Sequence, residues 1–280
     1  MKRLLALALA LAIPTAAPVV AQTALTDMDS ALVQRSANRG LLIYAYDQAA
    51  WHGTDDMLAK AKAAGVYEAL APQVGGWVVD GTPASSTLTF FDKSPDPKAV
   101  YVAHLTISGT KLVDSRLLGA DDDRTISPNR KKLIAAERTA RAALEAAKVA
   151  RCSDRPFNTV VLPPETPDGP TLVYFLTPQT VNDSWPMGGH YLVEVEPDGK
   201  TTQIRPFTKS CLTIAPDGKK ESTAAMMVSH LLDPVPTEIH VFTMFTSKLP
   251  LFVLTQQNNL LWSVEASAGQ AQIRVVNRKK

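Results

Sequence analysis

The chain has 280 residues, of which 45% are hydrophobic and 20% are charged, and its mean hydropathy is −0.03. This composition is typical of a globular protein, and 20 prolines and 14 glycines are too few for a collagen-like or wholly disordered chain. Without Lys2 and Arg3 the 29 basic residues become 27, which equals the 27 acidic residues. A chain with no net positive field is not expected to bind nucleic acid.

The first 21 residues are typical of a secretory signal peptide. Lys2 and Arg3 precede an apolar run over 4–13 and a segment of small residues that ends at Ala21. The run is too short to cross about 30 Å of hydrocarbon as a helix, and no later segment has roughly 18 uncharged apolar residues. We expect cleavage after Ala21 and a soluble mature protein, periplasmic or secreted, without a membrane span.

Residues 22–150 are expected to form an N-terminal region that combines helices with a meander. Acidic residues at 27–29 and a glycine at position 40 predict a short helix, and the run 41–46 predicts a strand. Thr54 predicts the N-cap of a second helix that ends at Gly65. Four strand-like runs bounded by turn residues then predict an antiparallel meander: 77–79, 87–91, 99–107 and 111–118.

The segment 128–150 predicts the long helix between the two halves of the chain. Ser127 is suited to the N-cap and Pro128 to the first helical position, and the alanine-rich segment has no internal glycine or proline. Its stripe of small residues is expected to pack on the meander. The basic cluster at 130–132 is interpreted as a solvated face of this helix.

Residues 151–280 are expected to form a C-terminal region that is mostly antiparallel β. Turn signals occur at 197–199 and 258–259. Strand-like runs include 159–162, 171–176, 190–195, 202–207, 224–231, 238–245, 249–254, 260–264 and 272–276. The predicted fold class is therefore α+β and antiparallel β-rich. Its N-terminal half has two or three helices on a meander, its C-terminal half is mostly β, and one long alanine-rich helix lies between them.

The two cysteines, Cys152 and Cys211, predict one structural disulfide in an oxidising compartment. A redox pair or a metal site is the alternative. No Cys-x-x-Cys spacing occurs, and two thiols alone rarely make a closed metal site.

The histidines of the β-rich half are the best candidates for a metal site. His190, His230 and His240 with Glu238 would supply three imidazoles and a carboxylate, a ligand set that suits zinc. On a strand, Glu238 and His240 would share one face. The alternative is that each histidine is a hydrogen-bonded residue of the core.

Two segments carry residues suited to ligand contact. Trp185 and His190 lie in an irregular stretch that includes Gly188 and Gly189, and recognition residues tend to lie on such loops. The alternative is that Trp185 folds back onto the core. Asp47 lies near Trp51 at a predicted strand-to-helix junction, but acids close to a helix start also have a structural role.

The sequence contains no Gly-x-Ser-x-Gly, P-loop or EF-hand signature, so we predict no catalytic residue and no cofactor. The expected function is non-catalytic binding of a small ligand or an envelope protein after export. One alternative is a periplasmic hydrolase, metal-dependent through His190, His230, His240 and Glu238. Another is a structural accessory of an envelope assembly.

Overall fold

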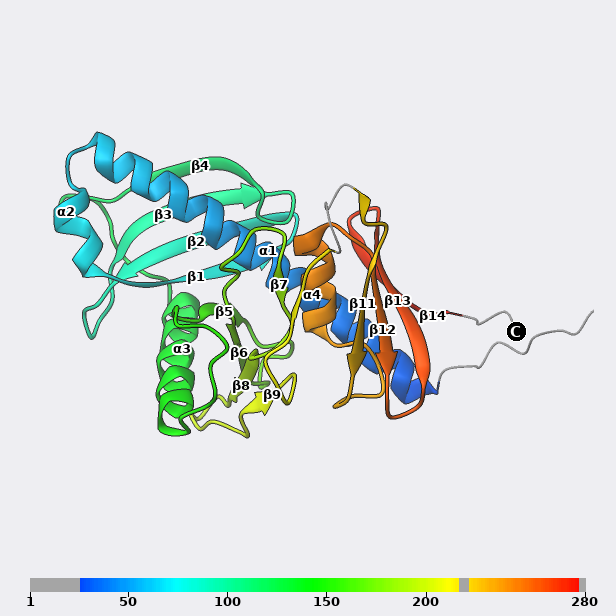
Figure 1. Ribbon diagram of the computed structural model, residues 1–280. Coiled ribbons are helices and arrows are strands. Elements are labelled where there is room, and N and C mark those ends of the chain that lie inside the picture. Colours follow the sequence, from blue (N-terminus) through cyan, green and yellow to red (C-terminus); the bar gives the residue numbers. More distant parts are fainter. Residues whose placement is uncertain (1–25, 217–221, 277–280) are drawn as a thin grey trace, which may run out of the picture.

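The computed structural model describes residues 26–216 and 222–276 (Figure 1). The expected signal peptide at 1–21 lies outside the described residues. The fold class is confirmed as α+β, with a mostly β C-terminal half. Within the described ranges, no helix combines the length and the apolar character that crossing a membrane requires.

The longest element is helix α1 (Asp27–Ala63), which has 37 residues. At about 1.5 Å per residue it is about 55 Å long. Its N-cap is Thr26, whose side-chain oxygen accepts from the Asp29 backbone N–H, and the chain leaves it through Gly65 at φ +68°. One end of α1 lies against the C-terminal sheet and the other against the meander (Figure 1).

The helix stop expected at Gly40 and the strand expected at 41–46 are wrong, because both segments lie inside α1. Thr54 does not cap a helix there, since its hydroxyl donates to the Ala50 carbonyl within α1. The run 41–46 has the β-branched and aromatic composition of a strand, but burial on several sides of a packed helix selects the same residues.

Gly40 is the point where α1 crosses α4 (Glu238–Ser247). A Cβ atom added to Gly40 would lie 2.4 Å from Val241 Cβ and 2.7 Å from the Glu238 carbonyl oxygen. Both atoms are part of the α4 backbone or bonded directly to it, so neither can shift unless the helix itself moves. The missing side chain therefore sets how closely the two helices approach.

The meander is confirmed as a four-stranded antiparallel sheet in the order β1-β2-β3-β4. Two short helices, α2 (Tyr67–Leu70) and η1 (Ala71–Gln73), lead into it. The strands are β1 (Val74–Thr82), β2 (Ser85–Asp92), β3 (Ala99–Thr106) and β4 (Lys111–Leu117). Its buried face, which includes Leu88 and Tyr101, belongs to the same core as the α1 residues Tyr46 and Ala49.

Helix α3 (Pro128–Ala146) begins as predicted, with Ser127 as its N-cap and Pro128 in its first turn. Ile134, Ala140 and Leu144 are buried against strands of the first two sheets. The end at Ala146 is four residues earlier than predicted, and such boundaries vary by a turn when the last turn frays.

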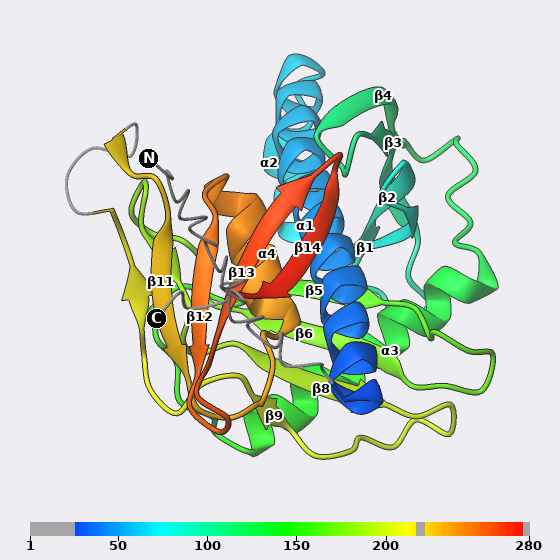
Figure 2. The same ribbon diagram turned by 90° about the vertical axis from the view of Figure 1, so that its right-hand side faces the viewer.

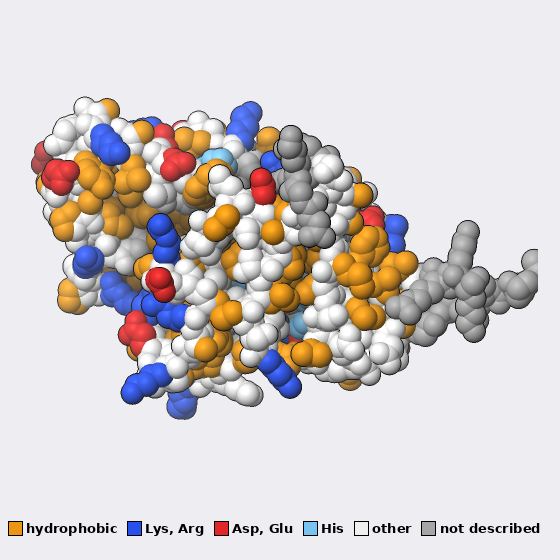
Figure 3. All heavy atoms as spheres, viewed as in Figure 1, with side chains coloured by type: hydrophobic (Ala, Val, Ile, Leu, Met, Phe, Trp, Pro, Cys, Tyr) orange, Lys and Arg blue, Asp and Glu red, His pale blue; other side chains and the backbone are white. Residues whose placement is uncertain are grey.

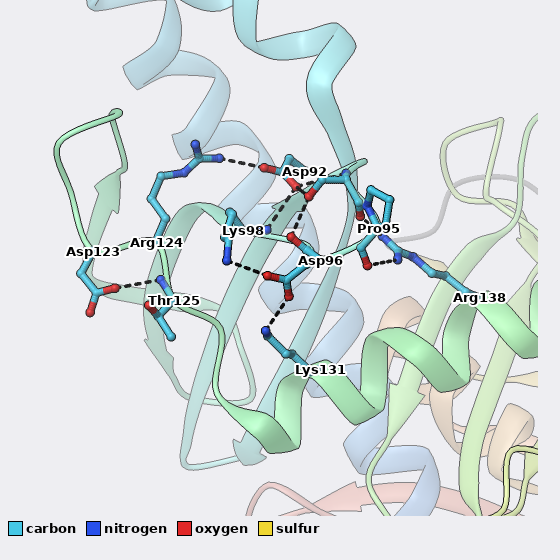
Figure 4. Close-up of polar contacts among 10 residues, drawn as sticks. Asp92, Pro95, Asp96, Lys98, Asp123, Arg124, Thr125, Lys131 and Arg138 are labelled. Atoms are coloured by element: carbon cyan, nitrogen blue, oxygen red, sulfur yellow. Dashed lines mark hydrogen bonds and ion pairs between the residues drawn. The ribbon is translucent and has the colours of Figure 1, made fainter.

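Salt bridges fasten the basic side of α3 to the meander. Figure 4 shows Lys131 paired with Asp96 at 2.6 Å, and Arg138 donating to the carbonyl of Pro95. Arg130 pairs with Asp80 of β1 at 2.9 Å. Lys and Arg side chains gather around α3 at the lower left of Figure 3. At least two members of the basic cluster at 130–132 thus have acidic partners.

The second sheet has the order β5-β6-β8-β9 and is antiparallel. Its strands are β5 (Asn158–Leu162), β6 (Thr171–Leu176), β8 (Tyr191–Val195) and β9 (Arg205–Pro206). Every residue of β6 is buried. Val173 and Phe175 face the core under α3, whereas Tyr174 and Leu176 face the core that includes α1 and α4. Burial on both faces explains why β6 is a continuous apolar run.

The third sheet has the order β11-β12-β13-β14. Its strands are β11 (Met226–His230), β12 (Leu251–Thr255), β13 (Leu260–Ser267) and β14 (Gln270–Val275). Figures 1 and 2 show α1 and α4 beside this sheet. β11 pairs with β12 in parallel, and the other neighbours are antiparallel.

The strand expected at 238–245 is wrong, because these residues form α4, the crossover between the two parallel strands. Thr237 caps α4 in a capping box with His240. The strand expected at 202–207 shortens to Arg205–Pro206. The division at position 150 stays a prediction, and one core cluster contains residues from both sides of it.

Substituting Gly40 by alanine is expected to destabilise the fold by about 1–3 kcal/mol, the usual cost of overpacking, despite the higher helix propensity of alanine. Chemical denaturation of G40A measures this loss. G119A is the matched control, because a Cβ at Gly119 would meet only Asp122 Oδ2 at 3.7 Å. Equal stability of G40A and G119A would contradict the close crossing of α1 and α4.

Candidate functional site

A cavity of about 450 Å³ lies between α1, α4 and the loop of residues 177–190. Its volume is within the range of small-molecule sites, roughly 300–1,000 Å³. The cavity joins segments from both halves of the chain, so no single stretch of sequence carries it. We refer to this loop as the 177–190 loop.

The α1 wall of the cavity consists of Asp47, Gln48 and Trp51. Asp47 and Trp51 are four residues apart and therefore share one face of the helix. The sequence placed them at a strand-to-helix junction, which is corrected here because both lie inside α1. Trp51 is 59% exposed, and its ring lies 4.8 Å from that of His52.

The α4 wall of the cavity was missed by the sequence analysis. Phe242, Thr243 and Thr246 belong to α4, and Lys248 is its C-cap at φ +59°. The β-branched and aromatic residues of this segment favour a strand, and strand geometry would not bring these side chains together. The available signal was Thr237, a good N-cap residue that follows Pro236 and precedes an acidic residue.

Trp185 lines the cavity but is not an exposed aromatic platform, since it is only 3% exposed and belongs to the main core. It lies in the short strand β7 (Trp185–Pro186), which pairs with β10 (Thr213–Ile214). The accessible part of the 177–190 loop includes Gln179 and Val181. Trp185 therefore anchors the loop, and Trp51 is the exposed indole of the cavity.

The His190 side chain forms hydrogen bonds with two backbone groups of the 177–190 loop. Its Nδ1 accepts from the Thr177 backbone N–H at 3.1 Å, and its protonated Nε2 donates to the Pro186 carbonyl at 2.9 Å. Burial lowers the pKa of His190 to about 4. The imidazole is therefore neutral at pH 7 and has both nitrogens engaged by backbone groups.

The predicted disulfide is present in the structure, with the Cα atoms of Cys152 and Cys211 5.4 Å apart. The disulfide packs directly against the 177–190 loop. A Cβ atom added to Gly189, which has φ +75°, would lie 2.5 Å from Cys152 Sγ, and one added to Gly188 would lie 2.3 Å from the Ser210 carbonyl oxygen. The two glycines thus let the loop pack against the disulfide-linked segments.

The charge of the Asp47 carboxylate has little stabilisation from neighbouring groups. Burial raises its pKa to about 6, and a side-chain hydrogen bond from Gln48, with Nε2 3.5 Å from Oδ2, opposes the shift. Within residues 26–216 and 222–276, Asp47 forms no ion pair. Lys248 also lines the cavity, but it does not pair with Asp47. Asp47 also contributes, after burial, to the raised pKa of Tyr44 on the same helix.

The proposed metal ligands lie in a polar network of the core. His230 contacts Asp233 at 2.9 Å, and its ring centroid is 4.7 Å from that of His240. Glu238 accepts from Tyr174 at 2.9 Å. Glu238 and His240 do not share a strand face, because both belong to α4.

Several polar atoms of this network already have protein partners. The His240 Nδ1 accepts from the Thr237 backbone N–H at 2.9 Å, and Arg205 pairs with Asp233 at 2.8 Å. Among the described residues, no three His, Cys, Asp or Glu side chains are placed to hold a metal ion. The geometry of the described residues therefore does not support the metal-dependent alternative, which stays a prediction.

Comparison of this chain with protein-family models, with curated proteins and with solved structures found no match. The site therefore has to be interpreted from its own geometry.

Replacing Asp47 by asparagine is expected to stabilise the protein by about 1–3 kcal/mol at pH 7. The pKa of the folded state, about 6, exceeds the ordinary value of 3.8, so folding with a charged Asp47 becomes less favourable as the pH rises between these values. Denaturation of wild type and D47N from pH 4 to 8 measures the effect. D55N, which changes an exposed acid on the same helix, is the control, and a stability loss in D47N alone would contradict the prediction.

The His190 imidazole predicts that stability falls as the pH drops from 6.5 to about 4. The unfolded chain takes up a proton near pH 6.5, whereas the folded protein does not until about pH 4. This difference amounts to about 3 kcal/mol over the window. H190Q should show a shallower slope of unfolding free energy against pH, with His240, whose pKa is also lowered, retaining its share. H104Q, which removes an exposed imidazole, is the control, and equal slopes in the two variants would contradict this role.

Proposed function

We propose that the chain is exported and binds a small ligand, without catalysis, in the cavity between α1, α4 and the 177–190 loop. The observation that carries this proposal is the cavity itself, about 450 Å³ with aromatic, hydroxyl and amide groups in its wall. Small-molecule sites orient their ligands with a few well-placed polar groups beside apolar and aromatic side chains.

The walls of the cavity support binding because they are held in place before a ligand arrives. α1 and α4 cross closely at Gly40, where the Val241 side chain occupies the space that a Cβ atom would need. The 177–190 loop is tied at both ends by His190 and packs on the Cys152–Cys211 disulfide. A site that is already ordered loses little conformational entropy on binding.

The chemistry of the wall favours binding over catalysis. His190 is the imidazole in the lining, and both of its nitrogens are engaged by backbone groups. It is therefore not placed to activate the hydroxyl of Thr177 or Thr243, as nucleophilic catalysis would require. No catalytic residue is assigned, and no cofactor is proposed.

Export rests on the first 21 residues, which have the pattern of a signal peptide. The disulfide is compatible with an oxidising compartment such as the periplasm. The concave site favours a small ligand over an envelope protein as the partner, because protein partners more often meet flatter and larger surfaces.

Filling the cavity should abolish ligand binding. T246W places an indole at a half-buried position of the cavity wall, and V113W adds one at an exposed position of β4 as the control. A thermal-shift screen with cationic, anionic, zwitterionic and neutral metabolites should find at least one compound that raises the melting temperature of wild type and V113W but not of T246W.

Native mass spectrometry of protein isolated from its own cells complements the screen, since it reports bound organic molecules and metals together. A ligand that still binds T246W, with circular dichroism showing an intact fold, would place the site elsewhere. A stoichiometric metal lost in H230A would favour the hydrolase alternative instead.

A further inference from the structure

Asp47 is the acidic residue of the cavity wall, and it forms no ion pair with any residue that the structure describes. By contrast, the two glutamates that are buried in the structure both face an arginine. Glu137 pairs with Arg141, and Glu238 lies 3.8 Å from Arg205. Buried carboxylates in proteins are usually paired in this way, because an isolated charge loses its hydration. Asp47 lacks such an internal partner, and its carboxyl lines a cavity that a ligand can enter.

The groups around Asp47 suit an organic cation. Trp51 lies one helical turn away with 59% of its surface exposed, and Phe242 lies in the opposite wall. Ammonium and guanidinium groups are attracted to aromatic faces and to carboxylates together. Thr243 and Thr246 add hydroxyl oxygens that accept N–H donors.

An anion is a poorer match for this wall. Asp47 would repel it, and His190 is neutral with its Nε2–H already donated to the Pro186 carbonyl. Lys248, on the exposed rim, is the one cation among the lining residues. Its charge opposes a bound cation and favours a bound anion, so it distinguishes the two ligand classes.

We infer that the cavity binds a small organic cation, an inference that rests on the proposed function. The ammonium or guanidinium group of the ligand pairs with the Asp47 carboxylate, and its carbon skeleton lies against Trp51. The ligand replaces the missing internal partner of Asp47. The cost of keeping this carboxyl partly buried and uncompensated in the free protein is offset when the cation binds.

Three probes of matched shape test the inference at pH 7.5 by isothermal titration calorimetry: 2-phenylethylammonium, neutral 2-phenylethanol and anionic 3-phenylpropanoate. The cation should bind at least about tenfold more tightly than the other two, as expected for a charge-assisted contact. 2-Phenylethylguanidinium replaces 2-phenylethylammonium in a parallel titration to test a guanidinium group.

Two variants of opposite sign make the test specific. D47N should weaken binding of the cation about tenfold or more while leaving that of 2-phenylethanol within about twofold. K248Q should strengthen cation binding about two- to threefold, because it removes a repelling charge at the rim. A melting curve for each variant confirms that it is folded.

The outcomes separate this inference from the proposed function. Preferential binding of 3-phenylpropanoate, or cation binding that D47N leaves unchanged, would overturn the inference while keeping the cavity as a site. If no probe binds, compounds from the thermal-shift screen decide: a D47N-sensitive cation supports the inference, and any other ligand lost in T246W overturns it. A screen without any hit overturns both.

Discussion

The crossing of α1 and α4 is the constraint on which the rest of the structure depends. Gly40 removes the side chain that would separate the helices, and Val241 occupies that space. α4 also connects the parallel strands β11 and β12, so its position sets that of the third sheet. Because α1 continues from this crossing to the meander, one helix contacts strands of all three large sheets.

The same crossing creates the cavity. Close to the contact point the helices share the core, and farther along α1 their side chains line a cavity whose remaining wall includes the 177–190 loop. The loop is shaped by the two hydrogen bonds of His190 to backbone groups and by the disulfide against which the loop packs. Such support is what holds a binding site in one geometry.

Charge is distributed unevenly between the core and the cavity. Arg205 compensates Asp233 and Glu238, and salt bridges fasten α3 to the meander. Asp47 has no comparable partner within the described ranges. Functional groups are often kept at the expense of stability, and an uncompensated carboxyl in a cavity wall fits that pattern.

The sequence by itself determined the elements that depend on local signals. The meander followed from alternating apolar residues with turn residues between them, and the start of α3 followed from Ser127 and Pro128. The disulfide followed from there being only two cysteines. Trp185 is buried in the core, which is the alternative given in the sequence analysis, and ligand contact by Trp185 and His190 stays a prediction.

Only the tertiary structure decided the segments whose local preference is overruled by packing. The runs 41–46 and 238–245 have strand-like composition, but burial between sheets makes both helical. The cavity depends on these two helices, so its α4 wall was invisible to local patterns. Asp47 became significant only once the assembled fold placed it in the cavity wall without an ion pair to any described residue.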